Sequence, residues 1–292
     1  MSDRLRVLPQ YLLPKQALTQ VMGRLAGLRA GALTTAAVRA FVRRYGVDMA
    51  EAAQSDPAAY PSFNDFFTRP LRTGVRPLAP SGLVCPVDGA ISQCGAIDGD
   101  LLVQAKGHAY TTRALLGGDE VLAARFRNGC FATLYLSPKD YHRIHMPCAG
   151  RLRRMVYVPG DLFSVNPLTA RAVPGLFARN ERVVCIFEGE GAPDGVRGTW
   201  ALVLVGATIV GSMATVWHGV VNPPRPGVLR HWDYADQVVR LERGAEMGRF
   251  LLGSTVVLLF GADAGAGCPP VFEPGWAAGA PVRMGQAMAR IP

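Results

Sequence analysis

Charged residues are scarce in this chain of 292 residues, since only 18% are Asp, Glu, Lys or Arg while 49% are hydrophobic. An ordinary soluble domain carries about 25% charged residues, so the surface is expected to be unusually apolar. No apolar run reaches the ~18 residues that a membrane-spanning helix needs, which argues against a transmembrane segment. The N-terminus has no continuous apolar core, and we therefore expect no secretory signal there.

The cysteines form no Cys-x-x-Cys pair, which excludes the usual zinc ribbon and thioredoxin-like motifs. A chain this long has enough core to fold without disulfides, so we expect reduced thiols. Cys148 follows Pro147 and is a conceivable nucleophile, but no neighbour that would lower its pKa is evident. The six are Cys85, Cys94, Cys130, Cys148, Cys185 and Cys268.

Positive charge is concentrated at the N-terminus. The net charge is +9, and the first fifty residues supply +6 of it with eight basic and two acidic residues. This asymmetry suggests an anionic partner, either nucleic acid or a membrane. The basic residues alternate with Leu, Val and Met and not with stacking aromatics, which favours a membrane surface.

Two amphipathic helices are predicted in the same region. One begins at Lys15 and the second covers about 34–45, ending at a Gly46 cap, while Asp48 is placed to cap a short third helix through Ala53. Packing on the protein's own core is the alternative use of such faces, but the sparse charge favours an interfacial role. The aligned apolar residues are Leu18, Val21, Met22, Leu25 and Leu28, then Val38, Phe41, Val42 and Tyr45.

The rest of the chain indicates a β-rich body. The sequence has 33 glycines and 22 prolines, so turns are frequent, and short apolar runs separate them. We predict an α+β fold, a mostly antiparallel β body with N-terminal amphipathic helices, divided into a membrane-associating segment 1–55 and a catalytic domain 56–292. The tail after Gly261 is Gly- and Ala-rich and is expected to be weakly structured. Strands are predicted at 131–136, 141–146, 151–158, 182–187, 201–209, 211–221 and 256–260.

The pair Gly253-Ser254 interrupts two apolar runs near the end of this body. The run 256–260 reads as a buried strand, and a glycine at such a place marks a bulge or a close backbone approach. An ordinary bulge with an exposed serine is the simplest interpretation. The alternative is a hydroxyl held by packed chain on both sides against the preceding carbonyl.

Two other stretches supply groups that could activate a serine. Residues 86–92 contain Asp88, and residues 137–147 contain His142 and His145. A hydroxyl becomes nucleophilic beside an imidazole that a carboxylate orients. Asp88-Gly89 is also typical of a hairpin turn, and the two histidines share a face only on a helix. Because a third ligand is lacking, we expect no metal site.

These stretches together resemble the motifs of bacterial phosphatidylserine decarboxylases. Leu252-Gly253-Ser254-Thr255 is similar to the family's self-cleavage motif, and Pro86-Val87-Asp88-Gly89 and the run from Tyr141 to Pro147 are similar to its aspartate and histidine motifs. Residues 158–166 and 177–182 look like further family motifs. The resemblance covers nearly the whole chain up to Phe260, with the motifs in the family's order.

The resemblance implies a proenzyme that makes its own cofactor. Ser254, activated by His145 that Asp88 orients, would attack the carbonyl of Gly253 and give an ester. Elimination then leaves a β chain of residues 1–253 and an α chain of 254–292. The dehydroalanine at the start of the α chain tautomerises and is hydrolysed to a pyruvoyl group, with release of ammonia. That group forms a Schiff base with phosphatidylserine, and loss of CO₂ gives phosphatidylethanolamine. His142 is the implied proton donor to the carbanion.

The resemblance also implies the partners. These are the membrane phospholipid phosphatidylserine and the chain's own α and β pieces as a heterodimer, with a higher oligomer left open and nucleic acid excluded. We expect peripheral attachment to the cytoplasmic side of the inner membrane. A pyruvoyl decarboxylase of soluble amino acids and a non-catalytic lipid-binding module are the alternatives. Lys139, Arg143 and Arg179 are the candidates for binding the substrate phosphate.

Overall fold

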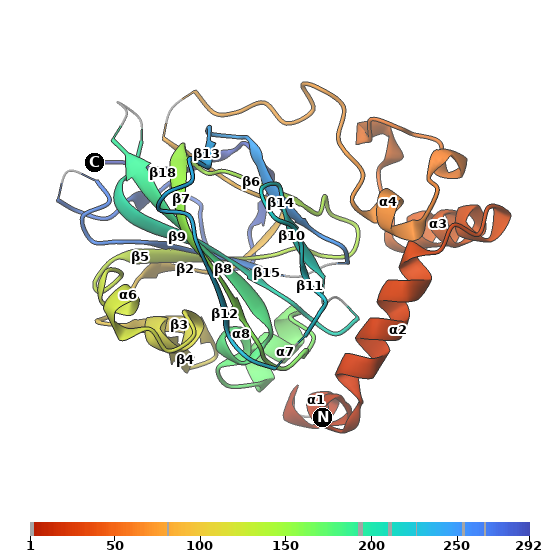
Figure 1. Ribbon diagram of the computed structural model, residues 1–292, viewed down its shortest axis with the longest axis horizontal. Coiled ribbons are helices and arrows are strands. Elements are labelled where there is room, and N and C mark those ends of the chain that lie inside the picture. Colours follow the sequence, from red (N-terminus) through yellow and green to blue (C-terminus); the bar gives the residue numbers. More distant parts are fainter. Residues whose placement is uncertain are drawn as a thin grey trace.

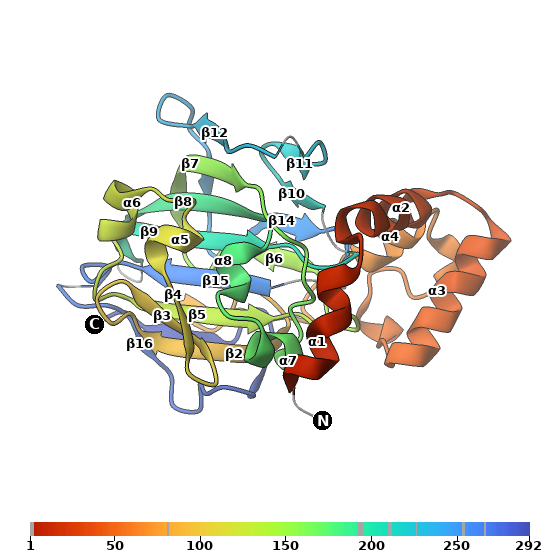
Figure 2. The ribbon, with the colours of Figure 1, turned by 90° about the horizontal axis from the view of Figure 1, so that it is seen from below.

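A large antiparallel sheet forms the middle layer of the body (Figures 1 and 2). The computed structural model describes residues 3–80, 82–191, 195–209, 212–225, 227–252, 255–265 and 267–292. Smaller sheets cover one face of the large sheet, and short helices with a hairpin cover the other. The predicted α+β class with an antiparallel β body is confirmed.

The strands of the large sheet come from the whole length of the body. In spatial order they are β12 (Arg230–Asp233), β7 (Gly150–Val158), β8 (Arg182–Glu190), β9 (Arg197–Val205), β15 (Thr255–Phe260), β5 (Cys130–Tyr135), β2 (Gly89–Ala96) and β17 (Pro281–Val282), with β13 (Arg240–Leu241) beside β7. A second sheet contains β11 (Gly219–Asn222), β10 (Met213–Thr215), β14 (Glu246–Phe250) and β6 (Arg143–His145). A third contains β1 (Leu83–Val84), β18 (Ala287–Arg290) and β16 (Val271–Phe272).

The opposite face of the large sheet is covered by the hairpin of β3 (Leu101–Ala105) and β4 (His108–Thr111) and by short helices. These are α5 (Thr112–Leu115), α6 (Glu120–Ala124), α7 (Pro167–Ala172) and α8 (Leu176–Arg179). The strand β15 belongs to both hydrophobic core clusters, one on each face of the large sheet. Val256, Leu258 and Phe260 pack into one cluster, while Val257 and Leu259 pack into the other. A strand buried on both faces reads as a continuous apolar run, which is why this one was predictable.

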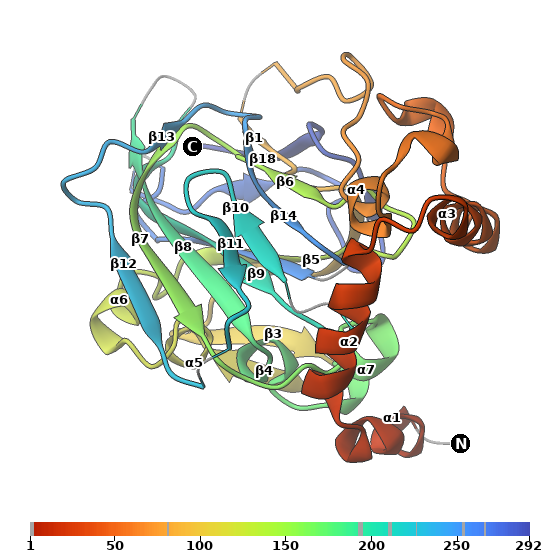
Figure 3. The same ribbon diagram turned by 45° about the vertical axis from the view of Figure 1, so that its right-hand side comes forward.

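The N-terminal helices stand beside the body, and Figure 3 brings α2 forward along its side. Their bounds are α1 (Asp3–Leu12), α2 (Lys15–Gly27) and α3 (Ala32–Tyr45), followed by the short 3-10 helices η1 (Met49–Glu51) and η2 (Pro57–Ala59) and by α4 (Phe63–Phe67). Gly46 ends α3 in a left-handed conformation with φ of 68°, and Asp48 accepts a hydrogen bond from the Ala50 amide, as predicted for both caps. Helix α1 was not predicted, because Pro9 lies inside it.

The helices α2 and α3 use their apolar faces differently. Phe41 of α3 packs on α4, with ring centroids 5.1 Å from Phe63 and 5.8 Å from Phe66. On α2 the buried residues are Thr19 and Ala26, while the predicted apolar face stays largely exposed. The phenylalanines of α4 form a separate apolar cluster with residues of α3. The domain boundary between 55 and 56 stays a prediction.

Several local predictions need correction. Asp88-Gly89 makes no hairpin, because β1 pairs with β18 while β2 pairs with β5 and β17. The strand predicted at 201–209 begins earlier, at Arg197, and the region 211–221 contains the hairpin of β10 and β11. The C-terminal tail is ordered into β16, β17 and β18, since β17 and β18 pair with residues 83–90 far back in the chain and β16 pairs with β18.

Among the described residues, no single helix has the length and apolar composition to cross a membrane. The helices α2 and α3 meet those criteria only as a pair, with a bend of 114° between them.

Candidate active site

The predicted cleavage pair, Gly253 and Ser254, lies outside the described residues. The structure describes both flanks, however. The strand β14 ends at Phe250 in the second sheet, and β15 begins at Thr255 in the large sheet, so the chain passes from one sheet to the other across this pair. Both strands are paired on both sides, β14 with β10 and β6 and β15 with β5 and β9. Packed chain therefore holds the segment at each end.

His142 lies directly against the incoming flank, since its carbonyl accepts a hydrogen bond of 3.1 Å from the Phe250 amide. Its imidazole is fully buried and rests on the Phe67 ring at 4.1 Å between centroids. Nδ1 lies 2.8 Å from the Asp140 carbonyl oxygen, which can only accept, so Nδ1 carries the proton. Nε2 therefore presents a lone pair, and this buried atom has no hydrogen-bond partner among the described residues.

The pKa of His142 is lowered to about 3, chiefly because the ring is buried; the hydrogen bond to the Asp140 carbonyl raises the pKa in part, and the positive charge of Arg69 contributes to lowering it. The imidazole is thus neutral at physiological pH, with an acceptor nitrogen facing the site. The predicted role of His142 as a proton donor requires that the ring first take up a proton, which its burial opposes.

His145 is the second imidazole, and it lies on β6 opposite Glu246 of β14. Its Nδ1 donates to the Gly244 carbonyl at 2.8 Å, and its Nε2 accepts from the Tyr141 hydroxyl at 3.0 Å. Burial lowers the pKa of His145, while the charges of Glu246 and Asp88 raise it in part. The ring is therefore a neutral base with its lone pair at Nε2.

Asp88 influences His145 through its charge but does not make the predicted hydrogen bond to that imidazole. Its carboxylate accepts from Arg76 through Nε at 3.0 Å and through Nη2 at 2.6 Å, and Oδ1 also accepts from the Met284 amide at 2.8 Å. The Gly244 carbonyl takes the position at His145 Nδ1 that the carboxylate was expected to fill. Asp88 acts on His145 through its charge in this structure, and its role in cleavage stays a prediction.

Two cavities meet at Tyr135, which lines both. The first, of about 280 Å³, is mainly apolar, is lined by Phe41, Phe67 and Ser164, and reaches Leu252 just before the cleavage pair. The second, of about 610 Å³, is the more polar of the two, and its walls include Asp88, Arg76 and Tyr141. Tyr135 thus lines both a mainly apolar space and a space with charged walls, a combination that suits an amphiphilic substrate.

The other sequence candidates have different surroundings. Lys139 lines the polar cavity, but Arg143 is paired with Glu246 at 2.7 Å, and Arg179 is paired with Asp161 at 3.3 Å on the surface. Only Lys139 of the three predicted phosphate ligands thus faces one of the two cavities. Cys148 is fully buried, and burial raises its pKa to about 12, so its thiolate is not populated.

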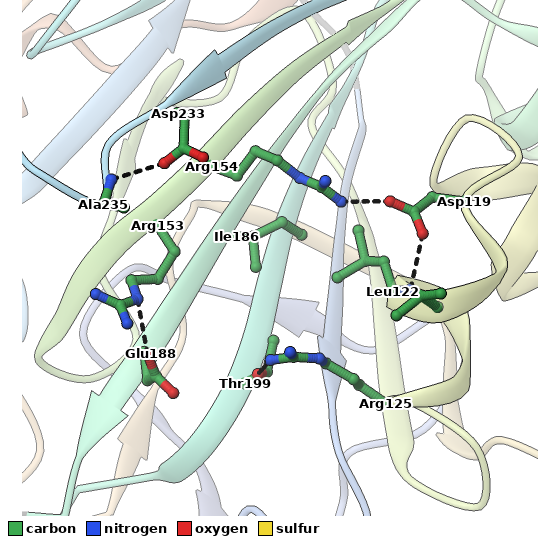
Figure 4. A pocket seen from close by; sticks show the side chains of 11 residues that line it. Asp119, Leu122, Arg125, Arg153, Arg154, Ile186, Glu188, Thr199, Asp233 and Ala235 are labelled. Carbon is green, nitrogen blue, oxygen red and sulfur yellow. Dashed lines mark hydrogen bonds and ion pairs between the residues drawn. The ribbon is translucent and has the colours of Figure 1, made fainter.

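A further hollow of about 560 Å³ lies elsewhere on the large sheet, between β7, β8 and α6 (Figure 4). Its arginines are already paired within the hollow, Arg154 with Asp119 and Arg153 with Glu188 at 2.8 Å. Arg125 donates to the Thr199 hydroxyl at 2.9 Å. The hollow contains none of the predicted catalytic residues, so its size does not make it the active site.

Three residues of the site were missed from the sequence. Arg76 and Glu51 form an ion pair of 2.6 Å beside Asp88. The Tyr141 hydroxyl donates a hydrogen bond to Nε2 of His145. Arg76 lies in the proline-rich stretch before the first strand, where no periodicity marks it. Tyr141 lies within the histidine motif, four residues before His145, and its place in that motif was the one signal available.

Comparison with known proteins agrees with this geometry. The family model described as phosphatidylserine decarboxylase matches residues 63–290, and a second model, described as PSD, matches residues 5–46. The phosphatidylserine decarboxylase proenzyme of Delftia acidovorans is 68% identical over 99% of this chain and 98% of that protein. The proenzymes of Variovorax paradoxus and of an Azoarcus species are 68% and 67% identical, each over 100% of this chain and over 99% and 97% of those proteins. The chain therefore belongs to the phosphatidylserine decarboxylase family.

Proposed function

We propose that this protein is a phosphatidylserine decarboxylase proenzyme that cuts itself between Gly253 and Ser254 and then converts phosphatidylserine to phosphatidylethanolamine. The observation that carries this proposal is the 68% identity to proteins named as such proenzymes along the whole chain. The products of cleavage are a β chain of residues 1–253 and an α chain of 254–292, which stay together through the pairing of β15 with β5 and β9.

His145 is the proposed base for cleavage. Its Nδ1 proton is committed to the Gly244 carbonyl, so Nε2 is the nitrogen that receives the proton of the Ser254 hydroxyl. The Tyr141 hydroxyl donates to this lone pair in the structure, so it must either move aside or relay the proton. The negative charge of Asp88 then stabilises the imidazolium that forms.

The surroundings of residue 254 suit a pyruvoyl group. The next residue along the chain, Thr255, has a buried hydroxyl without a hydrogen-bond partner among the described residues, and a hydroxyl can donate to a carbonyl oxygen formed at position 254. A pyruvoyl group supplies a ketone that captures a primary amine and accepts the electrons left by departing CO₂. His142 is the residue proposed to hold and deliver the proton that replaces the carboxylate.

The substrate is proposed to bind across Tyr135. The apolar cavity beside Leu252 takes lipid chain, and the polar cavity, with Lys139 on its wall, takes the charged headgroup. A soluble amino acid has no lipid chain to fill the apolar cavity that helix α3 lines. This cavity therefore disfavours the alternative, a pyruvoyl decarboxylase of soluble amino acids. The direct test is phosphatidylethanolamine formation from phosphatidylserine in detergent micelles by the wild-type chain and by Ser254→Ala. Activity on free serine alone, or equal activity of both chains, would refute the proposal.

We further propose that α1 and α2 attach the enzyme to the cytoplasmic side of an anionic inner membrane. Large apolar side chains on these helices are exposed, Leu12 by 88% and Leu25 by 52%, with Arg24 and Arg29 close by. Apolar burial in the lipid would combine with roughly 1 kcal/mol of attraction for each basic residue near the surface. The basic contribution weakens as salt screens it, whereas the apolar contribution persists.

Vesicle flotation tests this attachment. The proteins compared are the wild type and a chain in which Leu12 and Leu25 are replaced by serine, which keeps the charge and the fold of the body. The wild type is expected to float with phosphatidylglycerol vesicles and the variant to be depleted. Equal recovery of both proteins would show that these leucines do not attach the enzyme.

A further inference from the structure

Arg76 makes the closest contacts of the Asp88 carboxylate. Two of its guanidinium nitrogens face both carboxylate oxygens, with Nε 3.0 Å from Oδ1 and Nη2 2.6 Å from Oδ2. Both side chains are shielded, with 6% of Arg76 and 10% of Asp88 exposed. Burial alone would lower the pKa of Arg76, but its hydrogen bonds to Asp88 and Glu51 raise it above the ordinary value. This geometry fixes both the position and the rotation of the carboxylate.

The same guanidinium joins parts of the chain that are far apart in sequence. Nη2 also binds Glu51 of η1 at 2.6 Å, so the helical N-terminal segment is tied to the site. On the other side of the carboxylate, Oδ1 accepts from the Met284 amide at 2.8 Å, and the neighbouring Arg283 reaches Glu51 at 3.1 Å. Self-cleavage would separate these partners into two chains, because Met284 belongs to the α chain and Arg76 to the β chain.

We propose that Arg76 is a positioning residue for self-cleavage. Its Nε and Nη2 hydrogen bonds hold the Asp88 carboxylate at the distance and angle from which the carboxylate acts on His145. The proposal rests on the role given above to Asp88. Oδ1 accepts from Nε of Arg76 and from the Met284 amide, and Oδ2 accepts from Nη2 and Nε of Arg76, so hydrogen bonds fix both oxygens of the carboxylate. Without Arg76, the shielded Asp88 carboxylate loses the cation that balances its charge, whereas Glu51 keeps its ion pair with Arg283.

Small displacements matter at such a site, since a shift of about 1 Å can cost roughly 100-fold in rate. We therefore expect Arg76→Ala to cleave at least about tenfold more slowly than the wild type. Arg76→Lys keeps the positive charge but loses the contact of two guanidinium nitrogens with the carboxylate, because a lysine acts as a point donor. Its cleavage rate should lie between those of the wild type and Arg76→Ala. Guanidinium ion, added far below denaturing concentration, can enter the polar cavity that Arg76 lines and should accelerate Arg76→Ala.

Arg154 offers a matched control. It pairs with Asp119, whose carboxylate also accepts a backbone hydrogen bond, here from the Leu122 amide at 2.9 Å, and the pair lies in the remote hollow of Figure 4. Arg154→Ala thus removes the same kind of interaction away from the site. Conversion of the 31.3 kDa chain into two pieces is followed during cell-free synthesis, with thermal melting of each product as a measure of folding.

The expected result is slow cleavage of Arg76→Ala, guanidinium rescue of that variant and not of Asp88→Ala, and normal cleavage of Arg154→Ala. Wild-type rates for Arg76→Lys or for folded Arg76→Ala would overturn the proposal, as would equal slowing by Arg154→Ala. If Arg76→Ala does not fold, the rate of Arg76→Lys decides alone. Normal cleavage of Asp88→Ala would instead refute the role of Asp88, so the two failures are distinguishable.

Discussion

The buried neutral imidazole of His142 should make the stability of this protein depend on pH. Its pKa lies at about 3 in the folded chain against the ordinary 6.5, chiefly because it is buried. As the pH falls below 6.5, the unfolded chain takes up a proton at this residue while the folded chain does not, so the folded state loses relative stability until the pH reaches about 3. The contribution of the neutral His142 to the stability of the folded state is therefore fully present above pH 6.5 and is lost as the pH falls towards 3.

The magnitude follows from the pKa difference. Each pH unit inside this window costs about 1.4 kcal/mol, so His142 alone should remove about 2 kcal/mol between about pH 7.5 and about pH 5. The measurement is denaturant unfolding of the uncut Ser254→Ala chain at both pH values, with and without His142→Gln. Glutamine does not titrate, so the acid-induced loss should be smaller by that amount, even though the variant is less stable at neutral pH.

If the chains with and without His142→Gln lose the same free energy of unfolding, the buried neutral imidazole is refuted.

Three further outcomes are expected. Asp88→Ala and His145→Ala should each leave the chain largely uncut on a time-course gel, and efficient maturation of either would remove that residue from the cleavage mechanism. His142→Ala should mature at the normal rate yet form little phosphatidylethanolamine, so full activity would contradict its role after cleavage. A Cβ at Gly89 would lie 2.2 Å from the Tyr135 carbonyl oxygen, so Gly89→Ala should displace the neighbouring Asp88 and slow maturation by about tenfold or more, which unchanged kinetics would disprove.

The parts of the fold that were predictable are those whose sequence pattern reflects burial. The run 256–260 reads as a strand because both of its faces are packed, and Gly46 and Asp48 read as caps because their local chemistry suits few other uses. The C-terminal strands β17 and β18 were missed because each is short and gains its stability from partners near residue 85, a pairing that no local pattern contains.

The site divides in the same way. His142 and His145 were found through a motif, and the structure places both near the cleavage flanks. The partner of Asp88 was predicted wrongly, because a carboxylate beside histidines suggests an imidazole, while in the fold Arg76 reaches it from the proline-rich connection. Sequence shows which groups can react, but which of two strong partners a buried carboxylate binds depends on tertiary placement.

The central claim is self-cleavage between Gly253 and Ser254, and the intact mass of the purified protein tests it most directly. We expect two chains in place of the 31.3 kDa precursor, namely residues 1–253 and residues 254–292, the second with a ketone and no free amine at its N-terminus. A carbonyl reagent such as a hydrazine should label only that second chain. A single uncut chain, or a second chain that begins with an ordinary serine, would contradict the account.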